Sequence, residues 1–356
     1  MRRPRLSSRE NYLRAASFRC PEYIPCRISP FWPVWNTYRE RLEEIARRYS
    51  LLFPGYRPGA IEYDERPGIV RIDEYRRDAF GCLWHFTIKG YQGQVVEHPL
   101  DDWSKLRDFE MPDPDEGLPS ESGGLTPWEQ VYEAMERARE RGDLVVAGMP
   151  HGFFFQRLYY LRGFRNFLVD VVRRPPELYE LIEMLTEYNL ELVRRLLKFG
   201  SVDVVSFGDD LGTQTGMPIS PRAFRELILP TYKKVFGLAR SSGAHVRLHT
   251  DGRVVEVIDQ LVEAGVTILN IQDRVNGLDT AASLMRSGVC VDLDIDRQYL
   301  VPRRGPEEVK AYIRRVVELL KPKRGGLMMY AEVHPPTPLE NIRALAEAMA
   351  EVMWLD

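Results

Sequence analysis

Acidic and imidazole side chains stand where short apolar runs of the sequence end. Asp210 follows one run, His249 and Asp251 follow a second, and Glu332 follows the last. Carboxylates and imidazoles exchange protons and bind divalent ions of borderline or hard character. We therefore predict a metal site made of His249, Asp251 and Glu332. Asp210 and His249 are the predicted catalytic groups.

Two of these assignments have an alternative. His249 fits equally a neutral histidine that bonds a neighbouring loop, with Asp251 capping the helix that follows. Asp209 and Asp210 are adjacent, so in an extended segment their side chains point in opposite directions. We expect Asp210 to face a cavity, and the alternative is that both carboxylates brace the loop over residues 208–216.

A second group of residues has the chemistry of substrate contacts. An aromatic cluster follows the first predicted strand, although packing in the core or a lid would explain it as well. His151 and Gln272 also stand at the ends of apolar runs. The predicted substrate-binding residues are Phe31, Trp32, Trp35, His151, Asp209 and Gln272. Cys290 lies inside an apolar run and is expected to be a buried, unreactive thiol.

The elements that must position these groups alternate between strand and helix. Apolar runs at 144–148, 202–207, 245–248, 266–270, 289–293 and 326–330 predict parallel strands, and the run at 202–207 is rich in β-branched residues. Helical patterns fall between them, including those at 127–141, 153–173, 176–198 and 306–320. With an extended segment at 21–28 this makes about seven strands, and an eighth is expected near the first insertion. The predicted fold class is α/β, a (β/α)8 TIM barrel with an N-terminal extension and an antiparallel β insertion.

We expect a single domain over residues 1–356. Residues 1–125 form the extension and the insertion, whose strands are predicted at 69–73 and 82–87, and residues 126–356 form the regular units. Parallel strands place their reactive groups at one end of such a barrel. His249 and Glu332 should therefore meet at one mouth.

Composition excludes several classes of protein. The chain has 356 residues, 44% of them apolar, and a formal net charge of -3, which disfavours binding to nucleic acid or to an anionic membrane. The four cysteines form no close pair, so neither a zinc ribbon nor a disulfide framework is expected. No apolar run approaches the length of a membrane span, and a reducing cytoplasm is the expected compartment.

Several motifs in order resemble the uroporphyrinogen decarboxylase (URO-D) superfamily, which includes decarboxylases and methyltransferases that use corrinoids and coenzyme M. The motifs extend over most of the chain. They are Ser8-Arg9-Glu10, Pro21-Glu22-Tyr23-Ile24-Pro25, Gly208-Asp209-Asp210-Leu211-Gly212-Thr213-Gln214, Ser220-Pro221, Leu229-Pro230, His249-Thr250-Asp251-Gly252, Glu263-Ala264-Gly265-Val266, Gly305-Pro306-Glu307-Glu308-Val309 and Thr337-Pro338-Leu339-Glu340-Asn341-Ile342.

Two departures from the family pattern refine what the resemblance implies. The true decarboxylases carry an arginine-rich motif where this chain has aromatics, and Arg27 alone cannot neutralise a substrate with many carboxylates. The methyltransferases ligate zinc with a histidine, which His249 matches, and with two cysteines. Asp251 and, within about a residue, Glu332 stand at the cysteine positions.

The resemblance implies a methyl-transferring enzyme close to the methyltransferase branch, with a corrinoid or a small methylated substrate. Its cofactors would be a divalent metal, zinc or another, and a corrinoid. Its partners would be a small-molecule substrate and a corrinoid protein, with a homodimer as a candidate assembly. One alternative is cofactor-free decarboxylation of a tetrapyrrole carboxylate, in which Asp210 stabilises a protonated pyrrole. Another is a non-catalytic barrel that binds a corrinoid or a metabolite.

Overall fold

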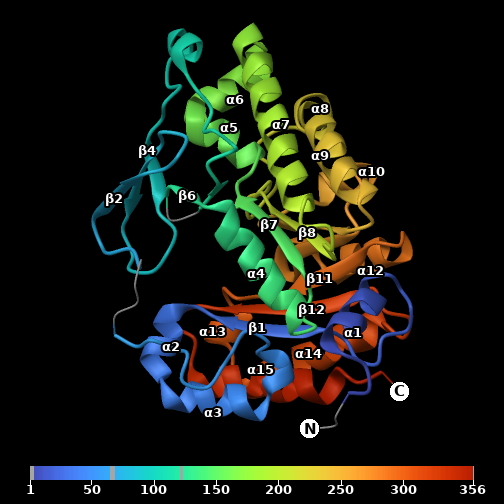
Figure 1. Cartoon of the computed structure of the whole chain (residues 1–356). Coiled ribbons are helices and arrows are strands. Elements are labelled where there is room, and N and C mark those ends of the chain that lie inside the picture. Colours follow the sequence, from blue (N-terminus) through green and yellow to red (C-terminus); the bar gives the residue numbers. More distant parts are fainter. Residues whose placement is uncertain (1–3, 65–68, 121–122, 356) are drawn as a thin grey trace. The chain divides into compact units, whose positions relative to one another are not determined.

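Parallel strands alternate with helices, as expected for the α/β barrel class (Figure 1). The computed structural model describes residues 4–64, 69–120 and 123–355. They divide into two compact units. Unit 1 is Met1–Ile69 with Ile268–Asp356, and unit 2 is Val70–Thr267.

Unit 1 is built on four parallel strands in the order β1-β12-β11-β10. The strands are β1 (Cys26–Pro30), β10 (Ile268–Gln272), β11 (Cys290–Asp294) and β12 (Leu327–Val333). The helices are α1 (Ser8–Ala16), α2 (Trp32–Tyr38), α3 (Glu40–Arg48), η1 (Ser50–Leu52), α11 (Asp273–Asn276), α12 (Leu278–Arg286), α13 (Leu300–Arg303), α14 (Pro306–Leu320) and α15 (Leu339–Val352).

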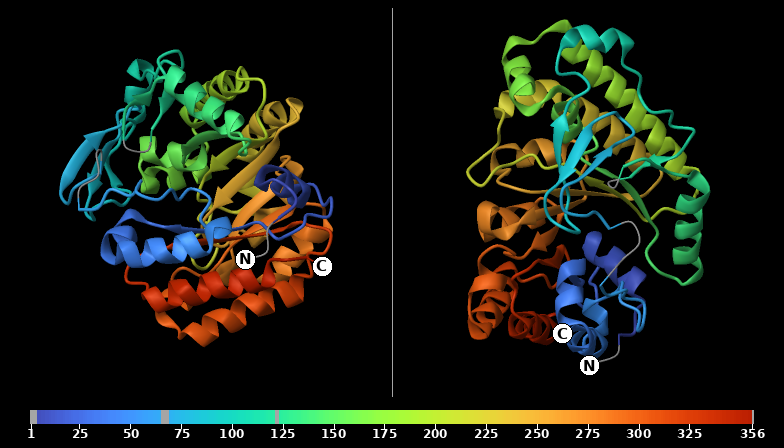
Figure 2. Two further views of the ribbon diagram at one scale, coloured as in Figure 1. Left: turned by 60° about the horizontal axis from the view of Figure 1, so that its bottom comes forward. Right: turned by 90° about the vertical axis from the view of Figure 1, so that its left-hand side faces the viewer.

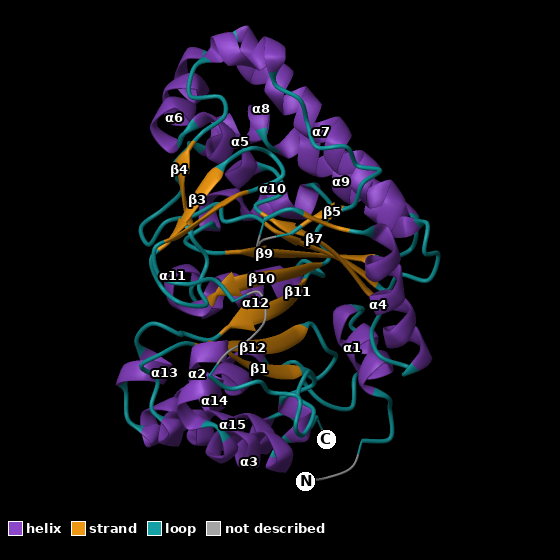
Figure 3. Cartoon of the chain, turned by 60° about the vertical axis from the view of Figure 1, so that its left-hand side comes forward, coloured by secondary structure: helices purple, strands orange, loops and turns teal. Residues whose placement is uncertain are grey.

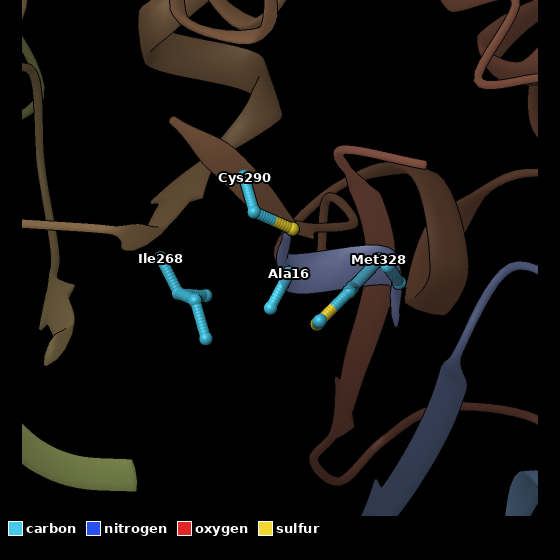
Figure 4. Packing of buried hydrophobic residues seen from close by; sticks show 5 residues of the cluster. Ala16, Ile268, Cys290 and Met328 are labelled. Atoms are coloured by element: carbon cyan, nitrogen blue, oxygen red, sulfur yellow. The ribbon is translucent and has the colours of Figure 1, made fainter. Parts of the chain in front are cut away.

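One face of this sheet changes from apolar to polar along the strands. Near the amino ends, Ile268, Cys290 and Met328 pack with Ala16 of α1 in a buried cluster (Figure 4). Cys290 is fully buried, which confirms its expected place in the core, and burial raises the pKa of its thiol. Near the carboxyl ends, the register aligns Gln272 with Asp294, Asp294 with Tyr330, and Tyr330 with Arg27. Polar groups of four strands thus share one layer.

Helix α14 shows how local sequence fixes an element of unit 1. Pro306 occupies its first turn, and the side chain of Glu308 accepts a hydrogen bond of 3.0 Å from the backbone N–H of Gly305. Its buried stripe is Val309, Ile313, Val316 and Leu320. Each of these burials stabilises the fold by about 1.5–3 kcal/mol. Helices α14 and α15 pack against each other, as the orange-red and red helices in Figure 2 show.

Unit 2 contains three parallel strands in the order β7-β8-β9. They are β7 (Val146–His151), β8 (Val204–Gly208) and β9 (His245–Thr250). The helices are η2 (Trp103–Asp108), α4 (Trp128–Glu140), α5 (Phe155–Arg162), α6 (Phe164–Arg173), α7 (Pro176–Leu197), α8 (Pro221–Leu227), α9 (Leu229–Ser241), η3 (Val255–Val257) and α10 (Ile258–Glu263). The antiparallel insertion is present as β2 (Glu74–Arg77), β3 (Leu83–Phe86) and β4 (Gln94–Glu97), with a second small pair formed by β5 (Leu118–Pro119) and β6 (Leu125–Thr126) (Figure 1 and Figure 3).

Three expectations about these elements need correction. The helix predicted over 153–173 is two helices, because Gly163, at a φ of 83°, separates α5 from α6. The strand predicted at 69–73 begins only at Glu74, since Asp73 adopts a positive φ of 59° in a turn. The described residues contain seven parallel strands, and the eighth one expected near the insertion is not among them.

No helix in the described part of the chain combines the length and the apolar character that crossing a membrane requires.

Candidate functional site

The register of unit 2 brings two histidines to the same level of the sheet. His151, the last residue of β7, pairs with Gly208 of β8, and Gly208 pairs with His249 of β9. A Cβ atom at residue 208 would lie 2.5 Å from Nδ1 of His151. Glycine at this position therefore leaves room for the imidazole of His151.

Asp210 lies between these two imidazoles. Its Oδ2 is 3.1 Å from Nε2 of His151, and its Oδ1 is 3.7 Å from Nε2 of His249. Oδ1 also accepts a hydrogen bond of 3.0 Å from the backbone N–H of Asp251, and Oδ2 accepts one of 3.3 Å from Gln156. Burial by itself raises the pKa of Asp210, but the hydrogen bond and the charge of His151, together with the charge of His249, outweigh it and lower the pKa to about 2. The group is therefore a carboxylate at neutral pH.

His151, Asp210 and His249 have the geometry of a metal-ligand set. One donor atom from each lies within 4.8 Å of the others, and all three side chains are partly buried. Asp251 places a second carboxylate beside this group, with Oδ1 3.6 Å from Nε2 of His249. Two nitrogens and one oxygen suit a borderline divalent ion such as zinc.

Asp209 has a different role from the one expected. Its side chain is fully buried, and its carboxylate accepts hydrogen bonds from the backbone N–H groups of Phe155 and Gln156 at 2.6 and 2.8 Å and from the hydroxyl of Tyr232 at 2.9 Å. Burial raises the pKa of Asp209 to about 6 although these hydrogen bonds oppose the shift. The N-cap of α5, Phe154, makes no side-chain cap bond, and Asp209, the first residue after β8, caps this helix instead. It therefore positions the site and is not available to a substrate.

The loop after β8 crosses the loop after β9 in close contact, and glycines at residues 212 and 252 make room for the crossing. A Cβ atom at Gly252 would lie 2.2 Å from the carbonyl carbon of Gly212, and one at Gly212 would lie 2.6 Å from the backbone of Arg253. Two backbone hydrogen bonds join the loops. The N–H of Gly212 donates to the carbonyl of Asp251, and the N–H of Arg253 donates to the carbonyl of Thr213. Asp251 thus belongs to this crossing. It does not cap the next helix, because helical structure begins only at Val255.

In unit 1, Glu332 is surrounded by protein partners. Arg297 bonds its Oε2, His334 Nε2 lies 3.0 Å from the same oxygen, and the hydroxyl of Tyr330 donates to Oε1 at 3.1 Å. Arg297 also lies 3.2 Å from Asp294, so it neutralises two carboxylates. A guanidinium at this carboxylate disfavours a metal ion beside it. A role for Glu332 beside His249, a residue of the other unit, stays a prediction.

The remaining substrate candidates also lie in unit 1. Phe31 packs against the imidazole of His334, with ring centroids 4.1 Å apart and ring planes tilted by 31°. Trp32 and Trp35 line one pocket. Gln272 is 8% exposed at the end of β10. Their contact with a substrate stays a prediction.

The sequence did not reveal that Gln156 belongs to the site. The backbone N–H of Asp210 donates to Oε1 of Gln156 at 2.8 Å, and Nε2 of Gln156 also donates to the hydroxyl of Tyr160 at 2.8 Å. Gln156 lies within the helix that Asp209 caps. A single glutamine in a helical pattern gives no signal of such a contact.

A comparison with protein families decides what this chain is. The family model described as uroporphyrinogen decarboxylase (URO-D) matches residues 77–352. The chain belongs to the uroporphyrinogen decarboxylase family. No curated protein sequence matches it.

One solved structure supports the barrel fold of this URO-D family member. A methyltransferase from Methanosarcina mazei superposes with a TM-score of 0.63 at 16% sequence identity, covering 96% of this chain and 98% of that one. A D-psicose 3-epimerase from Clostridium cellulolyticum H10 is more distant, with a TM-score of 0.38 at 12% identity, covering 64% of this chain and 83% of that one. The first of these likenesses confirms an α/β TIM-barrel fold.

Proposed function

We propose that this URO-D family protein is an enzyme that transfers a methyl-type group from a corrinoid or a small methylated substrate. The observation that supports the proposal is the group formed by His151, Asp210 and His249, whose donor atoms lie within 4.8 Å of one another. The group stands at the carboxyl ends of neighbouring parallel strands, where barrel enzymes carry their chemistry.

The donor set fits a metal, but not the thiolate-bound zinc of the methyltransferases that the sequence resembles. The side chains available are two imidazoles and a carboxylate, with Asp251 beside His249. A bound divalent ion would act here as a Lewis acid on a sulfur, oxygen or nitrogen atom of the substrate. His151 replaces Glu332 in the ligand set that we propose.

The chain's own residues do the rest. Asp210 remains ionised, with Nε2 of His151 at hydrogen-bond distance and Nε2 of His249 at 3.7 Å. The side chain of Gln156 makes two hydrogen bonds to Asp210. Its Oε1 accepts from the backbone N–H of Asp210, and its Nε2 donates to Oδ2 of the carboxylate. These two bonds limit the rotation of the Asp210 side chain. This fixed arrangement lowers the cost of ordering the site when a substrate binds.

Metal analysis of the purified protein tests the metal part of the proposal. Protein loaded with zinc and then dialysed should keep about one ion per chain, and His151→Ala and His249→Ala should each lose it. His245→Ala is a matched control, because His245 stands on the same strand and its Nδ1 contacts Thr267 at 3.2 Å. Substoichiometric metal that neither site variant changes would contradict the metal assignment.

Methyl transfer is tested separately with methylcobalamin and a thiol acceptor, monitored by the corrinoid spectrum. Demethylation that depends on His249 supports the proposal. Tight binding of methylcobalamin without turnover would instead identify a binding protein. Conversion of uroporphyrinogen to products with fewer carboxyl groups would identify a decarboxylase.

A further inference from the structure

Unit 1 has a pocket of about 230 Å³ beside the carboxyl end of β1. TIM-barrel proteins bind their ligands at the carboxyl ends of the strands, so this pocket is in a position to hold a ligand. Pockets for drug-sized ligands measure about 300–1,000 Å³, so this one suits a smaller molecule. The described residues that line it are Pro30, Trp32, Trp35, Ala60, Ile61 and Glu62.

Two indole rings line this pocket, and contacts with neighbouring residues fix each of them. The indole N–H of Trp32 donates a hydrogen bond of 2.9 Å to the backbone carbonyl of Glu62. Trp35 stacks on Tyr56, with centroids 5.7 Å apart and planes at 10°, and meets Phe53 edge-on at 6.4 Å. Rings held in this way need little further ordering when a ligand binds.

The ring of Tyr56 is itself anchored. Its hydroxyl donates to Glu43, a carboxylate that is 7% exposed and that also accepts from Tyr63 and pairs with Arg47 at 3.2 Å. The hydrogen bond from Tyr56, followed by that from Tyr63, lowers the pKa of Glu43, so it stays ionised and keeps both phenols oriented. This network makes Trp35 a rigid wall.

The charge of the lining selects one class of ligand. Glu62 is the one charged residue among the described lining residues, and none of them is basic. An anion would find no cationic partner there. Indole faces attract cations within about 6 Å of the ring centroid, and pairs of aromatic rings recognise quaternary ammonium groups in this way. We propose that the pocket binds a small organic cation of the methylated ammonium class, held between Trp32 and Trp35 with Glu62 as counter-ion.

This inference adds a chemical class to the proposed function, because that function leaves the small methylated substrate open. A role of the cation as methyl donor rests on the proposed function. Binding does not, and it requires no metal and no turnover. Failure of methyl transfer and failure of cation binding are therefore distinguishable.

Calorimetry on the full chain tests the inference with choline and its neutral carbon analogue, 3,3-dimethylbutan-1-ol, at fixed ionic strength. The two probes have nearly the same shape and differ in charge. Choline should bind at least about tenfold more tightly than the alcohol. Equal affinity of the two probes, or no binding of choline, would overturn the proposal.

Variants locate the binding site. Glu62→Gln removes the charge of an exposed side chain and should weaken choline about fivefold without changing the alcohol. Trp32→Leu should weaken choline about tenfold. Glu180→Gln, an exposed carboxylate of α7, and Trp103→Leu, an indole of unit 2, are the matched controls and should leave choline affinity unchanged. Loss of affinity in the controls but not in the pocket variants would place the cation elsewhere.

Discussion

Nε2 of His151 and Oδ2 of Asp210 lie 3.1 Å apart, although 59 positions separate the two residues in the sequence. The contact depends on the parallel pairing of β7 with β8, which sets His151 opposite Gly208. Glycine at position 208 therefore allows His151 and Asp210 to lie close enough to bind the same ligand.

Asp210→Asn should lower metal affinity at least about tenfold, because it removes the one charged oxygen donor of the group. The amide keeps the shape of the side chain and can still accept from the N–H of Asp251, so the free energy of unfolding should change by no more than about 2 kcal/mol. Metal content after dialysis and urea unfolding measure the two effects. Asp259→Asn, at an exposed position of α10, should change neither. Full metal retention in Asp210→Asn would exclude this carboxylate as a ligand.

Gly208→Ala should abolish metal binding by steric displacement. The added methyl would lie 2.5 Å from Nδ1 of His151, so the imidazole must move away from Asp210. Gly148→Ala is a stringent control, because Gly148 lies on the neighbouring strand and its added Cβ would meet no atom within 4 Å. A zinc titration of both variants separates the outcomes, and equal zinc affinities would show that His151 is not a ligand in this position.

The register that produces this contact explains what the sequence could and could not predict. Apolar runs predicted the parallel strands, and the strand ends predicted Asp210 and His249 as site residues, whose roles stay predictions. Chain order alone could not show that His151 faces Asp210, because that depends on how β7 pairs with β8. It also could not distinguish Asp209 as a helix cap, since the capped helix begins 54 positions earlier in the chain.

Asp209→Asn should destabilise the protein by about 2–4 kcal/mol. The amide has one acceptor oxygen, whereas the carboxylate accepts from two backbone N–H groups and a hydroxyl. A buried donor left without its partner costs about 1–3 kcal/mol. Tyr232→Phe removes only the hydroxyl and should cost about 1–2 kcal/mol. Urea unfolding compares both variants with the wild type, and an unchanged midpoint for Asp209→Asn would refute its capping role.

Arg297→Ala should destabilise unit 1 by about 3–5 kcal/mol, because it leaves two largely buried carboxylates, Asp294 and Glu332, without their guanidinium. The control is Arg225→Ala, which breaks an exposed pair with Glu263 and should cost less than about 1 kcal/mol. Chemical denaturation of each variant gives the comparison. Similar losses of unfolding free energy for the two variants would show that Arg297 stabilises the protein no more than an exposed arginine does.

Asp273 should make stability fall as pH rises toward neutrality. Burial raises its pKa from 3.8 to about 7, a hydrogen bond of 2.7 Å from the hydroxyl of Tyr312 opposes the shift, and the charge of Asp296 adds to it. Below pH 3.8 both the folded and the unfolded chain hold the proton. Between pH 4 and 7 only the folded chain holds it, so this group lowers the free energy of unfolding by about 1.4 kcal/mol per pH unit, and the loss ends above pH 7.

Asp273→Asn cannot ionise, and its stability relative to wild type should rise over the same interval. Urea unfolding from pH 4 to 8 measures that difference, and a difference independent of pH would show that Asp273 ionises normally in the folded protein. Tyr312→Phe extends the test, because loss of its hydrogen bond should carry the pH dependence beyond pH 7.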